Sequence, residues 1–261
     1  MIRISDKTLC CGCTACMNIC PAQCIVMRRD REGFDYPVAN PDMCLKCGLC
    51  EKICPMLNPA QKVEPVAAYA ARCESRTMAA SSGGIFPLLA REIIENGGVV
   101  CGAAMDSSCM VEHREAETID ELSAFSGAKY VQSELYSIFE DVKCRLKEGT
   151  KVLFSGTPCQ IAGLRSYLRD EYENLYTVDI ACHGVPAPGL WEKYKTALEK
   201  QYSSNLKNVE FRDQSNGWRH YNIRYEFADR TVKVPRLKDP YLTLFLQDMT
   251  LRPSCYDCRL R

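Results

Sequence analysis

Residues 10–21 read CCGCTACMNICP, and residues 44–55 read CLKCGLCEKICP. Each stretch contains the pattern C-x2-C-x2-C-x3-C-P, which holds 4Fe-4S clusters in bacterial two-cluster ferredoxins. The predicted metal ligands are Cys10, Cys13, Cys16, Cys20, Cys44, Cys47, Cys50 and Cys54. We expect a chain with two 4Fe-4S clusters to carry electrons.

The spacing also predicts which cysteines share a cluster. Three cysteines separated by two residues can surround one cluster, because the short loops turn backbone N–H groups toward the sulfur atoms. The fourth cysteine of each run ligates the other cluster in this arrangement. We therefore assign one cluster to Cys10, Cys13, Cys16 and Cys54, and the second to Cys44, Cys47, Cys50 and Cys20. Cys11 and Cys24 lie beside these ligands and are expected to be spectators.

Zinc and disulfide bonds are alternative uses of many cysteines. Zinc sites pair two C-x2-C units across a long gap, and they need neither a third cysteine at the same step nor a C-P ending. Disulfides at this density are typical of small secreted domains. The chain opens MIRISD, which does not read as a signal peptide, so we expect a reducing, cytoplasmic and low-oxygen setting. The pattern therefore favours iron–sulfur clusters.

Length and charge narrow the choice of partners. The 261 residues suffice for one large or two modest domains. They include 33 Lys plus Arg and 33 Asp plus Glu, so the formal net charge is zero. This balance favours neither nucleic acid nor an anionic membrane as a partner. No apolar run reaches the length of a membrane span, so we expect no membrane-spanning segment.

The pattern of residues divides the chain into regions. Residues 1–57 are expected to form an α+β ferredoxin-like module, and residues 58–65 a polar linker with prolines near both ends. Beyond them strand-like and helix-like segments alternate, which predicts an α/β domain with a largely parallel sheet. The expected strands are 66–72, 99–104, 151–154 and 175–181, and the expected helices are 82–96, 135–146, 158–168 and 191–202. Residues 209–212, 221–227 and 231–234 are expected to add antiparallel strands.

Four further cysteines occur where a site could form. Cys159 and Cys182 each follow an expected strand closely, and Cys255 and Cys258 form a C-x2-C unit. Because ligands of open α/β sheets gather at the carboxyl ends of strands, the four could hold a third 4Fe-4S cluster. The spacing leaves the alternative equally open, in which Cys159 and Cys182 are small buried residues.

Two loops could bind an anionic cofactor. The loop Ser81–Gly84 opens a helix, where free N–H groups attract phosphate and glycine permits close approach. In the loop 126–130, Lys129 could place a positive charge beside the same cofactor. Both signals are weak, because many glycine-serine turns bind nothing. His183 follows Cys182 at a strand end and is a candidate catalytic residue, with helix capping or packing as the alternative.

Several motifs occur together in one order. The ferredoxin runs are followed by SSGG (81–84), GAKYVQS (127–133), SGTPCQ (155–160), CHGVP (182–186) and RPSCYDC (252–258). With these motifs, the chain from about Val66 onward resembles the coenzyme F420 hydrogenase/dehydrogenase beta-subunit family. The resemblance implies FAD in an α/β domain at 66–190, the beginning of a C-terminal part at 191–261, and electron exchange with a small molecule.

The resemblance also implies roles for individual residues. It raises the expectation of a third cluster at Cys159, Cys182, Cys255 and Cys258. It implies a flavin lined by Ser81, Ser82, Gly83, Gly84, Lys129, Tyr130, Gln132, Ser155, Gly156 and Thr157. In that site Lys129 would stabilise reduced, anionic flavin as a candidate catalytic residue. The family continues past the last C-x2-C, whereas this sequence stops at Leu260-Arg261, so we expect a fragment or a shortened relative.

Two hypotheses for the function follow. The first is a flavin- and iron–sulfur-dependent oxidoreductase that passes electrons between its clusters and FAD, and exchanges them with coenzyme F420 or another small acceptor. The second is a non-catalytic electron-transfer subunit of a larger complex. Both require an electron-donor or electron-acceptor protein, such as a ferredoxin or a hydrogenase or dehydrogenase subunit. A zinc-stabilised structural protein is a third interpretation, and the direction of electron flow stays open.

Overall fold

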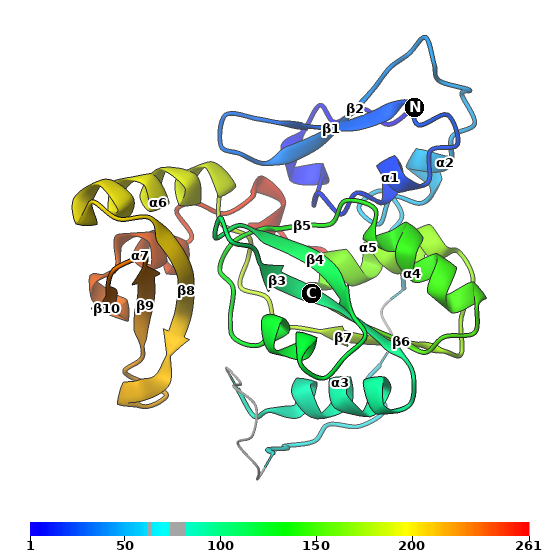
Figure 1. Cartoon of the computed structure of the whole chain (residues 1–261). Coiled ribbons are helices and arrows are strands. Elements are labelled where there is room, and N and C mark those ends of the chain that lie inside the picture. Colours follow the sequence, from blue (N-terminus) through cyan, green and yellow to red (C-terminus); the bar gives the residue numbers. More distant parts are fainter. Residues whose placement is uncertain (62–63, 74–81, 261) are drawn as a thin grey trace.

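The computed structural model describes residues 1–61, 64–73 and 82–260, which form three β-sheets (Figure 1). The N-terminal module contains η1 (Lys7–Leu9), α1 (Ala15–Asn18), β1 (Ile25–Arg29), β2 (Asp35–Ala39) and α2 (Leu49–Lys52). Strands β1 and β2 pair antiparallel, and the Asp30 carboxylate closes their turn by accepting from the backbone N–H groups of Glu32 and Phe34. The module therefore mixes short helices and strands, as its sequence predicts.

A five-stranded sheet forms the centre of the following region. Its order is β5 (Ser133–Glu134), β4 (Val111–Ala116), β3 (Val99–Met105), β6 (Val152–Gly156) and β7 (Leu175–Asp179). The β3–β4 pair is antiparallel, and the other three pairs are parallel. The expectation of a largely parallel sheet is confirmed.

Helices cover both faces of this sheet (Figure 1). Helix α3 (Ile85–Glu95) and η2 (Glu121–Phe125) lie on one face, and α4 (Ile138–Lys147) and α5 (Pro158–Leu168) lie on the other. Strand β3 contributes side chains to both faces, because successive side chains of a strand point to opposite sides of the sheet. Val100 packs with α3, and Cys101 packs with α4 and α5.

The N-terminal module packs against the α4–α5 side of the domain. Cys13, Ala15 and Ile53 belong to the same buried cluster as Phe139 of α4 and Leu164 of α5. The ferredoxin loops and the α/β domain therefore share one hydrophobic core.

A three-stranded antiparallel sheet lies beside the central sheet. Its order is β10 (Thr231–Pro235), β9 (Asn222–Phe227) and β8 (Leu206–Asp213), accompanied by α6 (Pro188–Tyr202), α7 (Pro240–Leu246), η3 (Gln214–Asn216) and η4 (Arg236–Lys238). Asp239 is fully buried at the start of α7, where its carboxylate accepts from the Tyr194 and Tyr225 hydroxyls at 2.8 and 2.6 Å. The antiparallel strands expected here are confirmed.

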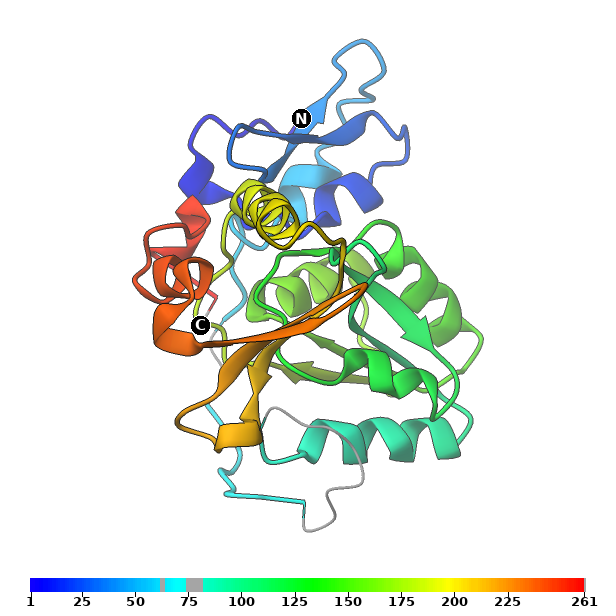
Figure 2. The same cartoon turned by 60° about the vertical axis from the view of Figure 1, so that its left-hand side comes forward.

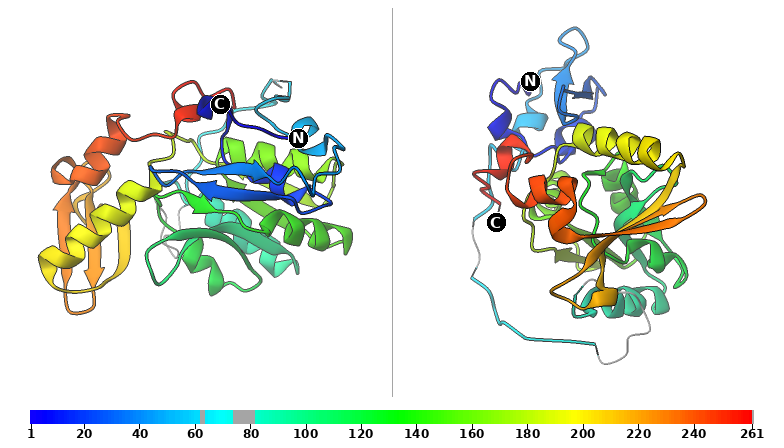
Figure 3. Two further views of the ribbon diagram at one scale, coloured as in Figure 1. Left: turned by 90° about the horizontal axis from the view of Figure 1, so that it is seen from above. Right: turned by 90° about the vertical axis from the view of Figure 1, so that its left-hand side faces the viewer.

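The end of the described chain returns to the N-terminal module (Figures 2 and 3). After α7 the chain pairs briefly at the Pro186–Leu251 bridge, and the η5 turn (Pro253–Cys255) then lies against η1. The last cysteines are thereby brought beside the first ones.

The strand expected at 66–72 is wrong, because the described residues there form no strand and Val66 and Tyr69 are exposed. Strand β4, which pairs with β3, was not expected, because its charged residues weaken the apolar signal. Residues 62–63 of the expected linker, Ser81 and Arg261 lie outside the described residues. None of the described helices combines the length and the apolar character needed to cross a bilayer.

Candidate electron-transfer site

The first hollow of the N-terminal module lies between the loop 10–16, the strands β1 and β2, and residues 54–56. The cysteines that line it are Cys10, Cys13, Cys16 and Cys54. The chain bends around this space through left-handed backbone conformations at Gly12 (φ 74°) and Thr14 (φ 61°). Glycine adopts such a conformation at little cost, so Gly12 suits the tight loop between the cysteines.

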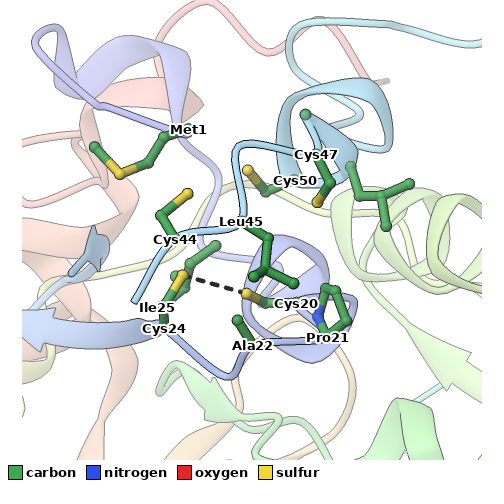
Figure 4. A pocket seen from close by; sticks show the side chains of 12 residues that line it. Met1, Cys20, Pro21, Ala22, Cys24, Ile25, Cys44, Leu45, Cys47 and Cys50 are labelled. Carbon is green, nitrogen blue, oxygen red and sulfur yellow. Dashed lines mark hydrogen bonds between the residues drawn. The ribbon is translucent and has the colours of Figure 1, made fainter. Parts of the chain in front are cut away.

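The second hollow lies between the second cysteine loop, residues 44–50, and the start of β1. Its cysteines are Cys20, Cys44, Cys47 and Cys50, with Cys24 beside Cys20 at an Sγ–Sγ distance of 3.5 Å (Figure 4). Backbone N–H groups already point at two of these sulfurs: Lys46 N donates to Cys44 Sγ at 3.4 Å and Ile2 N donates to Cys50 Sγ at 3.3 Å. Such bonds stabilise bound thiolate and help to set a cluster's potential.

Each hollow combines three cysteines of one run with the fourth cysteine of the other run. Four thiolates at one hollow are the donor set that a 4Fe-4S cluster requires. Burial and neighbouring sulfurs raise the pKa of Cys16 to about 12, so its thiolate needs a cationic partner such as cluster iron. Within residues 1–61, 64–73 and 82–260 no three His, Cys, Asp or Glu side chains converge tightly enough for a single metal ion.

Helix α5 touches the first hollow directly. A Cβ atom added at Gly163 would lie 2.7 Å from Cys13 Cβ and 3.0 Å from Cys13 Sγ. Only glycine leaves room for this approach. The helix that follows the SGTPCQ motif therefore packs on a predicted cluster ligand.

A further group of thiols lies at the start of α5. The Cys11 thiol lies beside those of Cys13 and Cys159, and Cys159 Sγ lies 3.1 Å from Thr157 Oγ1. Cys255 interacts electrostatically with Cys159 and Cys258. Cys11, expected to be a spectator, thus stands between a ligand of the first hollow and this second group.

The Cys182 loop is connected to the Cys255 loop through the backbone. Arg252 N donates to Val185 O, and Ala187 N donates to Thr250 O, each at 2.8 Å. This pairing brings the CHGVP and RPSCYDC motifs together. Of the four cysteines expected to bind a third cluster, Cys159, Cys255 and Cys258 lie near enough to interact electrostatically, and the Cys182 segment runs beside that of Cys255.

Lys129 is a partly buried cation near β4, because its charge interacts with those of Arg114 and His113. Its ammonium donates to Ser126 O at 2.9 Å, and among the described residues it makes no ion pair with a carboxylate. Burial, with a smaller contribution from the charge of Arg114, lowers the pKa of Lys129 to about 8. A buried ammonium without a carboxylate is suited to an anionic ligand.

His113 lies close to Lys129, although the sequence pattern did not single it out. Its Nε2 donates to Ser155 O at 3.0 Å, and its Nδ1 then accepts from Ser133 Oγ at 2.6 Å. Burial lowers the pKa of His113 to about 4, which fits this neutral form. The ring stacks on Phe154, with centroids 5.3 Å apart. The rarity of histidine in this chain was the one sequence feature that could have drawn attention to His113.

The other predicted flavin residues occupy different surroundings. Gln132 has a buried Oε1 atom without a hydrogen-bond partner. Thr157 caps α5, and its N–H donates to Gln160 Oε1, which also lies close to Gly156. Tyr130 instead packs its ring against Phe211 and Phe245 of the second core.

The loop at the start of α3 contacts the segment before it. Cys73 N donates to Gly83 O at 2.7 Å, and Gly84 caps α3 in a left-handed conformation. Ser82 lies in the same loop, whereas Ser81 lies outside the described residues. The flavin role of this loop stays a prediction.

His183 lies at the end of α7. Its Nε2 is 2.7 Å from Asp248 Oδ1 and 3.3 Å from Phe245 O, and its ring meets the Phe245 ring edge-on at 5.0 Å. These contacts correspond to the capping and packing role that the sequence left open. The catalytic role of His183 stays a prediction.

Two family models match the chain. The model described as 4Fe-4S dicluster domain matches residues 9–57, and the model that describes the C terminus of the coenzyme F420 hydrogenase/dehydrogenase beta subunit matches residues 149–260. They cover the ferredoxin runs and the motifs SGTPCQ, CHGVP and RPSCYDC, whereas SSGG (81–84) and GAKYVQS (127–133) lie outside both matches.

Individual relatives agree with the two models. An uncharacterized ferredoxin of Methanocaldococcus jannaschii is 44% identical over 62 residues, which are 23% of this chain and 90% of the relative. Coenzyme F420-dependent sulfite reductase of the same organism is 23% identical over 216 residues, which are 79% of this chain and 33% of the reductase. Ferredoxin-1 of Caulobacter vibrioides is 36% identical over 53 residues, which are 20% of this chain and 42% of that protein. The chain thus spans less than half of the latter two.

A solved structure of the F420-reducing [NiFe] hydrogenase complex from Methanosarcina barkeri aligns with a TM-score of 0.46 and 18% identity, over 69% of this chain and 60% of the other. This structural match is too weak to support an assignment, so the assignment depends on the sequence matches alone. The chain therefore combines a 4Fe-4S dicluster domain at residues 9–57 with a region at residues 149–260 that matches the C terminus of the coenzyme F420 hydrogenase/dehydrogenase beta subunit, and it is an iron–sulfur electron-transfer protein.

Proposed function

We propose that the protein is a flavin- and iron–sulfur-dependent oxidoreductase. Electrons pass between the two ferredoxin clusters and FAD, and from there to or from a small molecule. Coenzyme F420 is the first candidate for that molecule, because it appears in the name of the related sulfite reductase. Bound FAD would supply the exchange between single electrons and a hydride.

The residues near Lys129 fit an anionic cofactor such as FAD. Lys129 would provide the positive charge, and its contact with Ser126 O holds the ammonium in place. The buried Gln132 Oε1 lacks a donor, which an N–H group of a ligand could supply. His113, held neutral between Ser133 and Ser155, adds no competing charge beside Lys129.

A third 4Fe-4S cluster at Cys159, Cys182, Cys255 and Cys258 is part of the proposal. The interaction of Cys255 with both Cys159 and Cys258 supports it. Cys11 supports it further, because its thiol contacts Cys13 on one side and Cys159 on the other. A cluster held there would lie between the ferredoxin clusters and the α/β domain.

The observation that carries the proposal is the position of α5. Its first turn contains Cys159 and follows Ser155 and Thr157, whereas Gly163 in the middle of the helix touches Cys13. One rigid helix thus contacts a predicted ferredoxin ligand and adjoins the expected flavin residues. Short separations of this kind are what electron exchange between cofactors needs.

The test is anaerobic reconstitution with iron, sulfide and FAD, followed by removal of free FAD. We expect about eight irons per chain for two clusters, or about twelve with the third, at four irons per cluster. We also expect one tightly bound FAD. Full iron content with no retained flavin would refute the flavoenzyme and leave the ferredoxin function intact.

Lys129→Met should weaken FAD binding at unchanged iron content, and Lys147→Met is the matched control. Lys147 lies exposed at the end of α4. Equal FAD affinity in the two variants would contradict the role given to Lys129.

A specific observation also favours the second candidate, a non-catalytic subunit that transfers electrons to a partner. Met43 and Leu45, 52% and 67% exposed, lie on the loop that carries Cys44 and Cys47. Exposed apolar side chains beside a cluster suit a docking surface. The pure reconstituted protein distinguishes the candidates, since steady turnover of reduced ferredoxin with coenzyme F420 would exclude a purely non-catalytic role.

A further inference from the structure

Arg252 is a buried cation that forms no ion pair with a carboxylate of the described residues. Its side chain is among the largest that are fully enclosed, at 1% exposure. None of the ion pairs formed within residues 1–61, 64–73 and 82–260 includes Arg252. Burying a charge without a partner is costly, so a buried arginine normally has a carboxylate, a phosphate or another anion beside it.

The hydrogen bonds of Arg252 hold it against the first hollow. Its Nε donates to Cys10 O at 2.8 Å, its Nη2 donates to Asp35 O at 2.7 Å, and the same Nη2 lies 3.7 Å from Cys10 Sγ. Nη1 is buried and has no hydrogen-bond partner. Two neutral carbonyls and one sulfur therefore satisfy only part of the guanidinium.

Two further features shape the site around this side chain. The guanidinium lies over the ring of Tyr36 at 4.5 Å and near that of Phe34 at 5.3 Å. On another side Gly12 leaves space, since a Cβ there would come within 2.7 Å of Nη1. The guanidinium is thus fixed next to the cysteine loop by aromatic rings and by a glycine that permits close approach.

We propose that Arg252 supplies the countercharge for the 4Fe-4S cluster held by Cys10, Cys13, Cys16 and Cys54, and that it raises the reduction potential of this cluster. The inference rests on the proposed ligand assignment. A cluster ligated by four thiolates is an anion and becomes more negative when it gains an electron. A fixed positive charge therefore favours the reduced form more than the oxidised form.

The position of Arg252 along the chain gives this charge a second consequence. Arg252 stands three residues before Cys255, and its backbone N–H donates to Val185 O. The residue that would set the potential of the first ferredoxin cluster therefore belongs to the segment expected to bind the third cluster. A higher potential at the first cluster favours electron transfer to it from the second cluster.

The test is a redox titration of reconstituted Arg252→Met, followed by low-temperature paramagnetic resonance and compared with the wild type. At the wild-type midpoint of the affected cluster, we expect the reduced-to-oxidised ratio to fall at least about tenfold, equivalent to about 59 mV for a one-electron couple. The midpoint of the second ferredoxin cluster, assigned to Cys20, Cys44, Cys47 and Cys50, should not change. Arg31→Met is the control, because it removes an exposed arginine of the same module, whose charge is screened by solvent.

Arg252→Lys keeps the charge but not the planar donor geometry. At the wild-type midpoint, we expect the reduced-to-oxidised ratio of the first cluster in Arg252→Lys to stay within about threefold of the wild type. This variant therefore tests the role of the charge even if Arg252→Met does not fold. Unchanged midpoints in Arg252→Met at full iron content, or a tenfold fall in Arg252→Lys, would overturn the inference. A wild type that takes up no iron would instead refute the proposed function.

Discussion

Gly163 offers a sharp test of how the two parts of the protein meet. In an ordinary helix interior, Gly→Ala stabilises a protein by about 1 kcal/mol. Here the added carbon would lie 2.7 Å from Cys13 Cβ and 3.0 Å from Cys13 Sγ. Carbon atoms at their optimal separation are about 3.5–4.0 Å apart, so Cys13 or α5 must move.

The expected magnitude follows from two opposing effects. Overpacking of a filled core costs about 1–3 kcal/mol, which outweighs the gain in helix propensity. Gly163→Ala should therefore destabilise the iron-loaded protein by about 1 kcal/mol, which corresponds to a fall in Tm of about 2–4 °C for a chain of this size. The larger Gly163→Val should prevent the first cluster from forming and remove about four irons per chain.

The assay combines iron analysis with thermal unfolding under anaerobic conditions. Ser166→Ala is the matched control, because this partly exposed position lies one turn further along α5. Its iron content should equal that of the wild type. If Gly163→Ala raises Tm and keeps all its iron, the close contact between α5 and Cys13 is refuted. The proposed link through α5 between the first cluster and the expected flavin residues is then refuted as well.

Three further predictions follow from the site. Because the fourth cysteine of each run is assigned to the other cluster, the double variant Cys20→Ala/Cys44→Ala should lose about four irons, from a single cluster. The double variant Cys20→Ala/Cys13→Ala should lose about eight, from both clusters. A loss of only about four irons in the second double variant would refute the assignment of Cys20 to the other cluster. Because the pKa of Lys129 is about 8, FAD affinity should fall as the pH rises through 8, and an equal fall in Lys129→Met would contradict this assignment. His113 is neutral when folded, with a pKa of about 4, but takes up a proton near pH 6.5 when unfolded, so the stability it contributes above pH 6.5 is lost toward pH 4; denaturant unfolding of His113→Gln should show less of this acid dependence.

The ferredoxin module could be predicted from sequence because its ligands are local. Four cysteines at fixed steps define a loop, and the crossing of the fourth cysteine follows from the same spacing. The helix 158–168 was also predictable, since Pro158 begins it and the apolar face is regular. The parallel strands β6 and β7 gave clear apolar runs.

The remainder depended on contacts between residues far apart in the chain. Strand β4 alternates buried apolar positions with charged ones, so it resembles a surface segment until β3 pairs with it. The apolar run 66–72 gave the opposite error, because an apolar run becomes a strand only where another strand pairs with it, and the described residues there form none. The burial of Arg252 against Cys10, 242 positions away, leaves no local signal either.

Electron transfer from the ferredoxin clusters to FAD is the central claim, and one rapid-mixing experiment tests it most directly. Fully reconstituted, oxidised protein is mixed anaerobically with reduced ferredoxin, and the flavin absorbance is followed in the wild type and in Cys13→Ala. The account predicts fast flavin bleaching in the wild type and a rate at least about tenfold lower when the first cluster is lost. Equal rates in the two proteins would contradict it.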